Sequence, residues 1–138
     1  MTDLLGGCHC GDVTVSFAST LDPAATAPRA CDCSFCRKHG AGWVSDPGGE
    51  LAIATQDASL VRYRQVSNTA DFLLCAHCGV LVAVVLEESG SRFGAVNAGC
   101  LDAVFAAAEC ASPQRLARDD KLERWRRLWI PRVSISKR

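Results

Sequence analysis

Two apolar runs flank a cysteine pair in the stretch FLLCAHCGVLVAVVL, which spans residues 72–86. The run after the pair, residues 80–86, has the length of one buried strand, and a shorter apolar run, residues 72–74, leads into Cys75-Ala76-His77-Cys78. Gly79 follows the pair directly, and glycine tolerates the positive φ that such a turn often requires. The stretch therefore predicts an antiparallel hairpin whose turn presents two thiolates to one metal ion.

Two further cysteine clusters precede this hairpin in the chain. They are Cys8-His9-Cys10, followed by Gly11, and Cys31-Asp32-Cys33-Ser34-Phe35-Cys36. The chain holds 9 cysteines in 138 residues, an odd number, and its first residues lack the basic and apolar regions of a secretory signal. A disulfide framework needs an even count and an oxidising compartment, so we expect a cytoplasmic, metal-binding chain instead.

The number of clustered thiolates indicates two metal sites of different kinds. Structural zinc takes four protein ligands, whereas catalytic zinc takes three and keeps one position open. The two distant pairs predict a closed structural site made of Cys8, Cys10, Cys75 and Cys78. The remaining cluster predicts a second zinc ion on Cys31, Cys33 and Cys36, with water, Cys100 or His39 as candidates for its fourth ligand.

The rest of the chain is typical of short strands followed by a basic helix. Val13, Val15 and Phe17 alternate with polar residues, and further strands are expected at 42–45, 51–53, 60–66, 93–97 and 130–135, with a turn at 67–69. Strands at such short spacing predict a mainly β, antiparallel body. Residues 102–111 are alanine-rich and predict a helix, and residues 112–129 predict a basic helix that starts at Ser112-Pro113. Residues 1–138 are expected to form one domain.

Charge is unevenly distributed along a chain whose net charge is zero. Residues 1–110 carry 6 basic and 12 acidic side chains, and residues 111–138 carry 9 basic and 3 acidic ones. A basic tail can bind nucleic acid, but Leu122, Trp125 and Trp129 recur at helical spacing and predict packing on the acidic body. The longest apolar run, residues 80–86, is too short to span a membrane. We therefore expect neither a nucleic-acid nor a membrane partner.

Four motifs in order resemble the glutathione-dependent formaldehyde-activating enzyme family, whose domain is shared with centromere protein V. They are GCHCGDV at 7–13, CDCSFCRK at 31–38, FLLCAHCG at 72–79 and VNAGCLD at 96–102. The resemblance implies a Mss4-like fold, which is a tent of antiparallel sheets. It also implies a structural zinc on the two distant cysteine pairs and a second zinc on the middle cluster. The activity it implies is that of a carbon–sulfur lyase acting on S-hydroxymethylglutathione.

The middle cluster is the candidate catalytic site. A zinc ion held by three thiolates can bind an external thiol as thiolate, because zinc lowers the pKa of a bound thiol. Addition of that thiolate to an aldehyde gives a hemithioacetal, and the reverse reaction cleaves the carbon–sulfur bond. Arg37 and Lys38 follow the cluster and are candidates to bind the carboxylates of glutathione. The alternatives are a non-catalytic zinc-ribbon-like binding module and, with less support, a nucleic-acid or chromatin-associated module.

Overall fold

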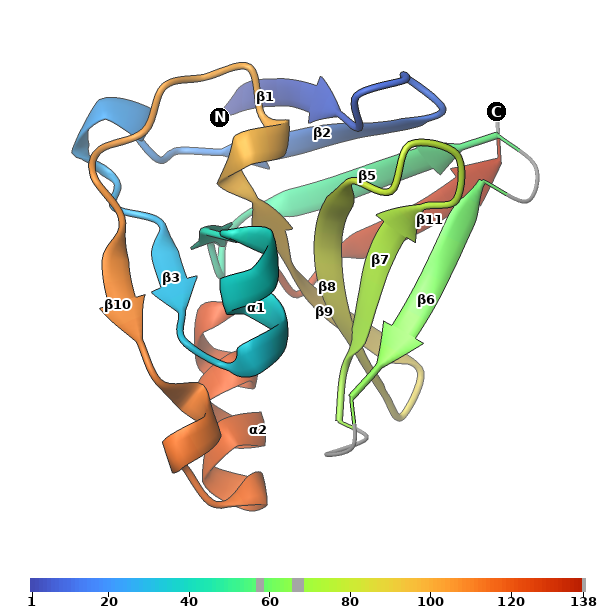
Figure 1. The fold of residues 1–138 in the computed structure, drawn as a ribbon. Helices are drawn as coiled ribbons and strands as arrows, with labels where there is room; N and C mark the ends of the chain where they lie inside the picture. The colour runs from blue at the N-terminus through green and yellow to red at the C-terminus, as the bar shows by residue number, and fades with distance from the viewer. Residues whose placement is uncertain (57–58, 66–68, 138) are drawn as a thin grey trace.

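Two β-sheets dominate the computed structural model of the chain, which describes residues 1–56, 59–65 and 69–137. The smaller sheet has the strand order β1-β2-β5-β11, and the larger has the order β10-β3-β4-β9-β8-β7-β6. In Figure 1 the smaller sheet lies across the top of the larger one, and both α-helices lie below the smaller sheet. The predicted mainly β fold with a C-terminal helix is thus confirmed.

The described elements have the following bounds. The strands are β1 Thr2–Gly7, β2 Val13–Ser19, β3 Arg29–Cys31, β4 Trp43–Val44, β5 Glu50–Thr55, β6 Leu60–Arg64, β7 Asp71–Cys75, β8 Leu81–Glu88, β9 Ser91–Asn97, β10 Glu109–Ala111 and β11 Val133–Lys137. The α-helices are α1 Ser34–His39 and α2 Arg118–Leu128, and short 3-10 helices occur at Pro23–Ala25, Ala98–Cys100 and Pro113–Arg115. The turn predicted at 67–69 falls mostly on residues 66–68, which lie outside the described residues.

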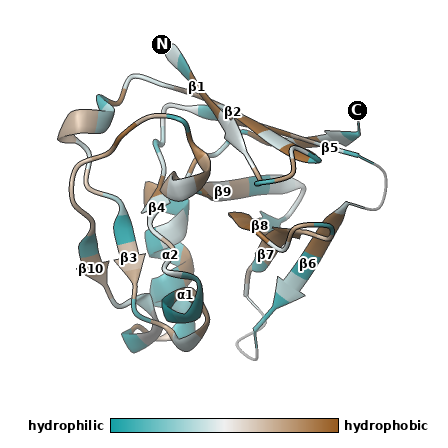
Figure 2. Ribbon diagram, turned by 45° about the horizontal axis from the view of Figure 1, so that its top comes forward, coloured by the Kyte–Doolittle hydropathy of each residue, from teal (hydrophilic) through white to brown (hydrophobic). Residues whose placement is uncertain are grey.

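The hairpin predicted at residues 72–86 is confirmed. β7 pairs antiparallel with β8, and Gly79 in the connecting turn has a φ of 80°, which glycine adopts without strain. β8 is buried from Leu81 to Leu86, because both of its faces pack against apolar side chains. In the hydropathy colouring of Figure 2 it is a brown strand near the centre of the molecule. A continuous apolar run is therefore the sequence signature of this central strand.

Two apolar clusters form the core. One joins the two sheets and includes Val13, Val15 and Phe17, whose alternation along β2 turns them inward as predicted. The other contains Trp43 and Trp129 and packs α2 and the middle cysteine cluster against the larger sheet. The second candidate metal site is thus built on a packed layer rather than on an isolated loop.

Two strand pairs are parallel, in contrast to the antiparallel pattern expected. β11 pairs with β5, and β10 pairs with β3. The helix predicted at 102–111 is wrong, since this segment is extended and ends in β10. Ala106 N–H donates to the Pro23 carbonyl at 3.1 Å, and Glu109 N–H donates to the Pro28 carbonyl at 2.9 Å. Pairing with the 23–31 segment outweighs the helix propensity of the alanines.

The C-terminal helix is shorter than the predicted span of 112–129. It covers Arg118–Leu128, and Pro113–Arg115 forms only a 3-10 helix. Ser112 makes no capping hydrogen bond, because its hydroxyl donates instead to Asp32 Oδ2 at 2.7 Å. Leu122 and Trp129 are buried against the body, and Arg126 forms a two-pronged ion pair with Glu88. Apolar packing and one ion pair therefore dock the helix.

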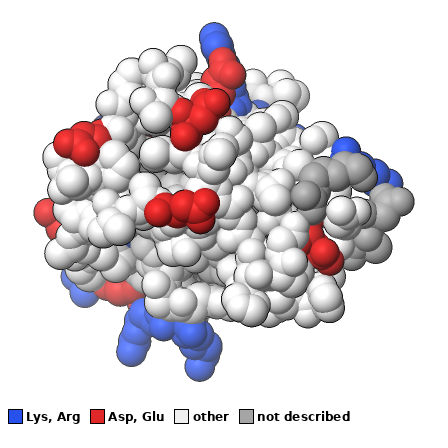
Figure 3. All heavy atoms as spheres, turned by 90° about the horizontal axis from the view of Figure 1, so that it is seen from above, with Lys and Arg blue, Asp and Glu red and all other residues white. Residues whose placement is uncertain are grey.

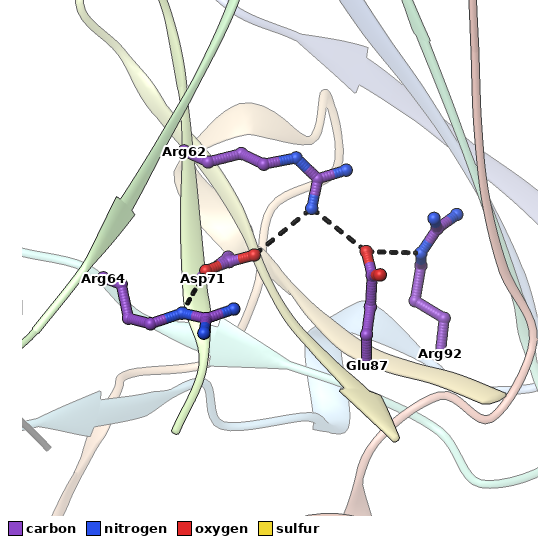
Figure 4. Close-up of polar contacts among 5 residues, drawn as sticks. All are labelled: Arg62, Arg64, Asp71, Glu87 and Arg92. Atoms are coloured by element: carbon purple, nitrogen blue, oxygen red, sulfur yellow. Dashed lines mark hydrogen bonds and ion pairs between the residues drawn. The ribbon is translucent and has the colours of Figure 1, made fainter. Parts of the chain in front are cut away.

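A network of ion pairs lies on the larger sheet. Figure 3 looks down on the smaller sheet and shows acidic groups scattered over a mostly uncharged face, with basic groups at the edges of the view. On the larger sheet, Arg64, Asp71, Arg62, Glu87 and Arg92 alternate in one ion-pair network across β6, β7, β8 and β9 (Figure 4). None of the described helices is long and apolar enough to cross a membrane.

Candidate metal centres and substrate groove

Four cysteine sulfurs meet where the β1–β2 connection approaches the β7–β8 turn. The sulfurs of Cys8, Cys10, Cys75 and Cys78 all lie within 4.8 Å of one another. Cys10 Sγ is 3.7 Å from Cys8 Sγ and 3.6 Å from Cys75 Sγ. Four sulfurs placed tetrahedrally at the usual zinc–sulfur distance would be about 3.8 Å apart. The arrangement therefore fits a single tetrahedral metal ion.

Backbone donors support the anionic form of these thiols. Val13 N–H donates to Cys8 Sγ at 3.2 Å, and Cys78 N–H donates to Cys75 Sγ at 3.4 Å. Hydrogen bonds from the backbone of Cys10 and then of Val80 lower the pKa of the Cys78 thiol to about 6. Against a backbone hydrogen bond from Asp12, burial and the neighbouring sulfurs raise the pKa of the Cys10 thiol to about 12, so a bound cation is needed to hold all four as thiolates. Because the thiolate is the form that binds metals, the turn geometry prepares this cluster for an ion.

The middle cluster is assembled by the start of α1. Cys31 ends β3, Cys33 is the N-cap residue of α1, and Cys36 lies in the first turn of the helix. Cys33 Sγ accepts the backbone N–H of Cys36 at 3.4 Å, which satisfies one of the free donors at the helix start. The three sulfurs lie within 4.8 Å of one another, so this cluster can also hold a metal ion.

Side chains from other elements donate to the same sulfurs. Trp43 Nε1 lies 3.5 Å from Cys36 Sγ, and Gln65 Nε2 lies 3.6 Å from Cys33 Sγ. The contact between Cys31 and Cys36 lowers the pKa of the Cys31 thiol to about 6, and the same contact, together with burial, raises the pKa of the Cys36 thiol. The N–H groups of Trp43 and Gln65 would offset part of the negative charge that three thiolates bring together.

Neither protein candidate for a fourth ligand joins the middle cluster. Cys100 is buried in the core that contains Cys8 and Cys75, and its thiol donates to the Leu81 carbonyl at 3.3 Å. His39 packs its ring on Phe35, with ring centroids 4.6 Å apart. Among the described residues, the group of potential ligands consists of the three cysteines alone.

A groove of about 540 Å³ borders the middle cluster. Cys31 and Cys33 line it on the cluster side, and Trp125 forms part of its aromatic wall. Lys38 from α1 and Lys121 from α2 contribute the positive charges, and Lys121 Nζ lies 5.4 Å from the centre of the Trp125 ring. Arg37 is exposed on α1, and it is not among the described residues that line the groove.

A smaller cavity of about 60 Å³ adjoins the same cluster. Cys31 lines both the groove and this cavity, whereas Cys36 lines only the cavity and Cys33 only the groove. Tryptophans 43, 125 and 129 form much of the cavity wall, and Arg29 and Arg124 also line it. The middle cluster therefore faces two spaces of different size and character.

Several groove and cavity residues were not predicted. The helical pattern set Lys121 apart from the apolar side that carries Trp125, but the two residues are four positions apart and line the same groove. That pattern does not reveal which part of the body the helix meets. Gln65 and Arg29 carry no local signal, because their roles arise only from pairing and packing between distant segments.

Comparison with known proteins agrees with the site geometry. A sequence profile of the glutathione-dependent formaldehyde-activating enzyme family matches residues 3–117. The crystal structure of a Rhodobacter sphaeroides protein is similar to this fold, with a TM-score of 0.53 and 30% sequence identity to this chain. The match covers 73% of this chain and 90% of that one. No significant match is found among curated proteins. Since the profile spans most of the chain and includes all three cysteine clusters, the chain belongs to the glutathione-dependent formaldehyde-activating enzyme family.

Proposed function

We propose that this chain is a zinc-dependent carbon–sulfur lyase acting on a thiol–aldehyde adduct of the S-hydroxymethylglutathione type. The observation that carries the proposal is the position of Cys31 and Cys33 at the edge of a 540 Å³ groove that also contains Lys38 and Lys121. Membership of the family supports formaldehyde and glutathione as the substrates. The distant pairs Cys8/Cys10 and Cys75/Cys78 would hold a purely structural zinc ion.

The middle cluster would hold the catalytic zinc ion. Three thiolates match the ligand number of zinc sites that keep one position for substrate. A zinc ion bound there would lower the pKa of a substrate thiol, so that the thiolate is available at neutral pH. The groove, which is lined by two of the three ligands, gives a peptide thiol access to that position.

Lys38 and Lys121 would bind the carboxylates of the thiol substrate. The two ammonium groups come from different helices and line the same groove. Arg37, next to Lys38, would add to the positive potential around the groove. Three thiolates exceed the charge of Zn²⁺ by one, so nearby cations also reduce the cost of bringing in a fourth thiolate.

Trp43 and Gln65 would keep the ligands oriented. Their N–H groups donate to Cys36 and Cys33 respectively, and such outer hydrogen bonds hold metal ligands in place. In the synthetic direction the substrate sulfur forms a bond to the carbonyl carbon of the aldehyde. The carbonyl oxygen becomes the hydroxyl of the adduct and takes up the proton that the thiol lost. Cleavage reverses these steps.

Titration of the cobalt-substituted protein with glutathione tests this assignment. A fourth sulfur on cobalt is expected to intensify the thiolate charge-transfer absorption, and formation of the formaldehyde adduct should exceed its spontaneous rate. Lys38→Ala combined with Lys121→Ala should weaken glutathione binding about tenfold or more, as expected for lost charge-assisted contacts. Arg127→Ala, an exposed change on α2, is the matched control and should bind as the wild type does.

An unchanged absorption spectrum in the presence of glutathione would contradict the proposal. The chain would then be assigned to the alternative class, a non-catalytic zinc-ribbon-like binding module. Equal glutathione affinities for the double lysine variant and Arg127→Ala would remove the groove from the proposed binding site. The absorption and affinity measurements thus test the metal position and the groove separately.

A further inference from the structure

The 60 Å³ cavity beside Cys31 and Cys36 contains two cationic side chains in an otherwise apolar wall. Arg29 comes from β3, and Arg124 comes from α2. Phe72, Val84 and the three tryptophans are among the other residues that line it. Both arginines are half-buried, and the buried part of a cation is costly unless an anion or a set of acceptors compensates it. The pair is therefore a candidate anion-binding site.

Neither arginine has an acidic partner among the described residues. Arg29 donates from Nη2 to Ser45 Oγ at 2.7 Å, and that hydroxyl in turn donates to the Leu128 carbonyl. Arg62, Arg64 and Arg126, by contrast, each pair with a carboxylate. A guanidinium has five N–H donors, so the bond to Ser45 leaves Arg29 with donors for a ligand.

The two guanidinium groups also act on each other electrostatically. Burial, and then the charge of Arg124, lower the pKa of Arg29, but an arginine remains protonated at physiological pH. A carboxylate bound between the two arginines would offset the repulsion between their charges. Its two oxygens can also accept two parallel hydrogen bonds from one guanidinium. Because Ser45 fixes one side of Arg29, little side-chain entropy would be lost on binding.

The cavity has the volume for a small molecule rather than for a peptide. A cavity needs about 10–15 Å³ to hold a single water molecule, so 60 Å³ admits a molecule of a few heavy atoms but not a peptide. Formaldehyde has only two heavy atoms and would leave the arginines unused. Glyoxylate, the smallest aldehyde that carries a carboxylate, has five heavy atoms and an anionic group that both arginines can bind.

We propose that this cavity is the aldehyde subsite and that it binds the carboxylate of a small oxo acid between Arg29 and Arg124. This inference rests on the proposed thiol–aldehyde chemistry and extends its substrate class. The groove holds the thiol, and Cys31, which lines both spaces, lies where the two substrates meet. The thiol sulfur then bonds to the aldehyde carbon, and the thiol proton ends on the former carbonyl oxygen.

Binding can be measured directly, because all three tryptophans of the chain line the cavity. Titration of the zinc-loaded protein with glyoxylate should change the tryptophan fluorescence, whereas acetaldehyde should have a much weaker effect. Arg124→Gln should raise the dissociation constant for glyoxylate about tenfold or more. Arg127→Gln, exposed on the same helix, is the matched control and should bind glyoxylate as the wild type does. Arg29→Lys is a second test, because it keeps the positive charge but removes the paired N–H donors of the guanidinium. It should also weaken glyoxylate binding.

Reaction measurements separate this inference from the proposed function. With glyoxylate and cysteamine, a thiol without a carboxylate, Arg124→Gln should lower kcat/KM about tenfold, and with formaldehyde and glutathione it should not. If Arg124→Gln instead lowers kcat/KM only with glutathione and formaldehyde, Arg124 binds a carboxylate of the thiol, and the aldehyde subsite is refuted. Failure of both reactions in the wild type would refute the lyase activity itself. Glyoxylate that leaves the wild-type fluorescence unchanged, or that binds Arg124→Gln and Arg127→Gln alike, would refute the cavity as an oxo-acid site.

Discussion

The sulfur of Cys10 lies 3.6 Å from the sulfur of Cys75, although the two residues are 65 positions apart in the chain. This contact joins the β1–β2 connection of the smaller sheet to the β7–β8 turn of the larger one. The ligands converge only in the folded chain, so metal binding at this cluster contributes directly to the free energy of folding. The same coupling is weaker at the middle cluster, whose ligands are neighbours in sequence.

Cys75→Ser should therefore be among the most destabilising substitutions in the chain. We expect the free energy of unfolding to fall by more than about 3 kcal/mol, because loss of a metal site belongs to the most damaging class of changes. Thermal unfolding of the zinc-loaded protein measures the effect. Cys110→Ser, at an exposed thiol outside both clusters, is the control and should change the unfolding free energy by less than about 0.5 kcal/mol. Equal midpoints for the two variants would contradict a folding role for the distant pairs.

Two metal ions per chain, held with different strength, are expected from the two clusters. Mild chelation should remove the ion at Cys31, Cys33 and Cys36 first and leave far-ultraviolet circular dichroism unchanged. Removal of the second ion should coincide with unfolding, because that ion ties the two sheets together. Metal analysis during chelation, with circular dichroism in parallel, checks the order. A single metal ion per chain, or simultaneous loss of both, would show that the division into two kinds of site is wrong.

Local patterns predicted those parts of the molecule that are specified by neighbouring residues. The 72–86 hairpin follows from two apolar runs and a glycine turn, and β2 follows from the alternation of Val13, Val15 and Phe17. The grouping of cysteines into two clusters follows from ligand number and spacing, and the structure brings the sulfurs of each cluster together. Helical spacing likewise identified Leu122 and Trp129 as buried residues.

Contacts between distant segments explain the parts that were not predicted. Ser112 followed by proline is a strong local start signal for a helix, but its hydroxyl donates to Asp32, 80 positions away, and α2 begins at Arg118. The segment before it becomes β10 because it pairs with β3. β1 was missed as well, since its Leu-Leu-Gly-Gly sequence has no alternation and is ordered by pairing with β2. Arg29 and Arg124 meet only after these contacts have formed.

Asp71→Asn tests the ion-pair network on the larger sheet. Burial alone would raise the pKa of Asp71, but the hydrogen bond from Arg64, with Arg62 beyond it, holds the pKa below 3.8. A carboxylate whose pKa is depressed by folding adds stability above its unfolded pKa and loses it as pH falls through the folded value. Wild-type stability should thus drop below about pH 4, and part of that drop should disappear in the variant.

At pH 7 the Asp71→Asn variant should be less stable by about 1 kcal/mol, since both arginine partners are substantially exposed. Urea unfolding at several pH values gives both the loss and its pH dependence. Glu123→Gln, on an exposed residue of α2, is the control and should change the unfolding free energy by less than about 0.5 kcal/mol. An unfolding free energy that falls with acid to the same extent in Asp71→Asn and the wild type would exclude Asp71 as a source of acid sensitivity.

Leu122→Ala should affect both stability and the proposed thiol site, because one helix serves both. Leu122 is 6% exposed and anchors α2, whereas Lys121 and Trp125 from the same helix line the groove. Truncation of a buried leucine costs about 2–5 kcal/mol, and a displaced helix would also move the groove wall. Urea unfolding measures the first effect, and glutathione titration under conditions where circular dichroism shows a folded protein measures the second. Leu116→Ala, at a residue that is 39% exposed and precedes the helix, is the control and should change both quantities much less. If Leu122→Ala lowers stability but binds glutathione as tightly as the wild type, α2 does not form a wall of the thiol site.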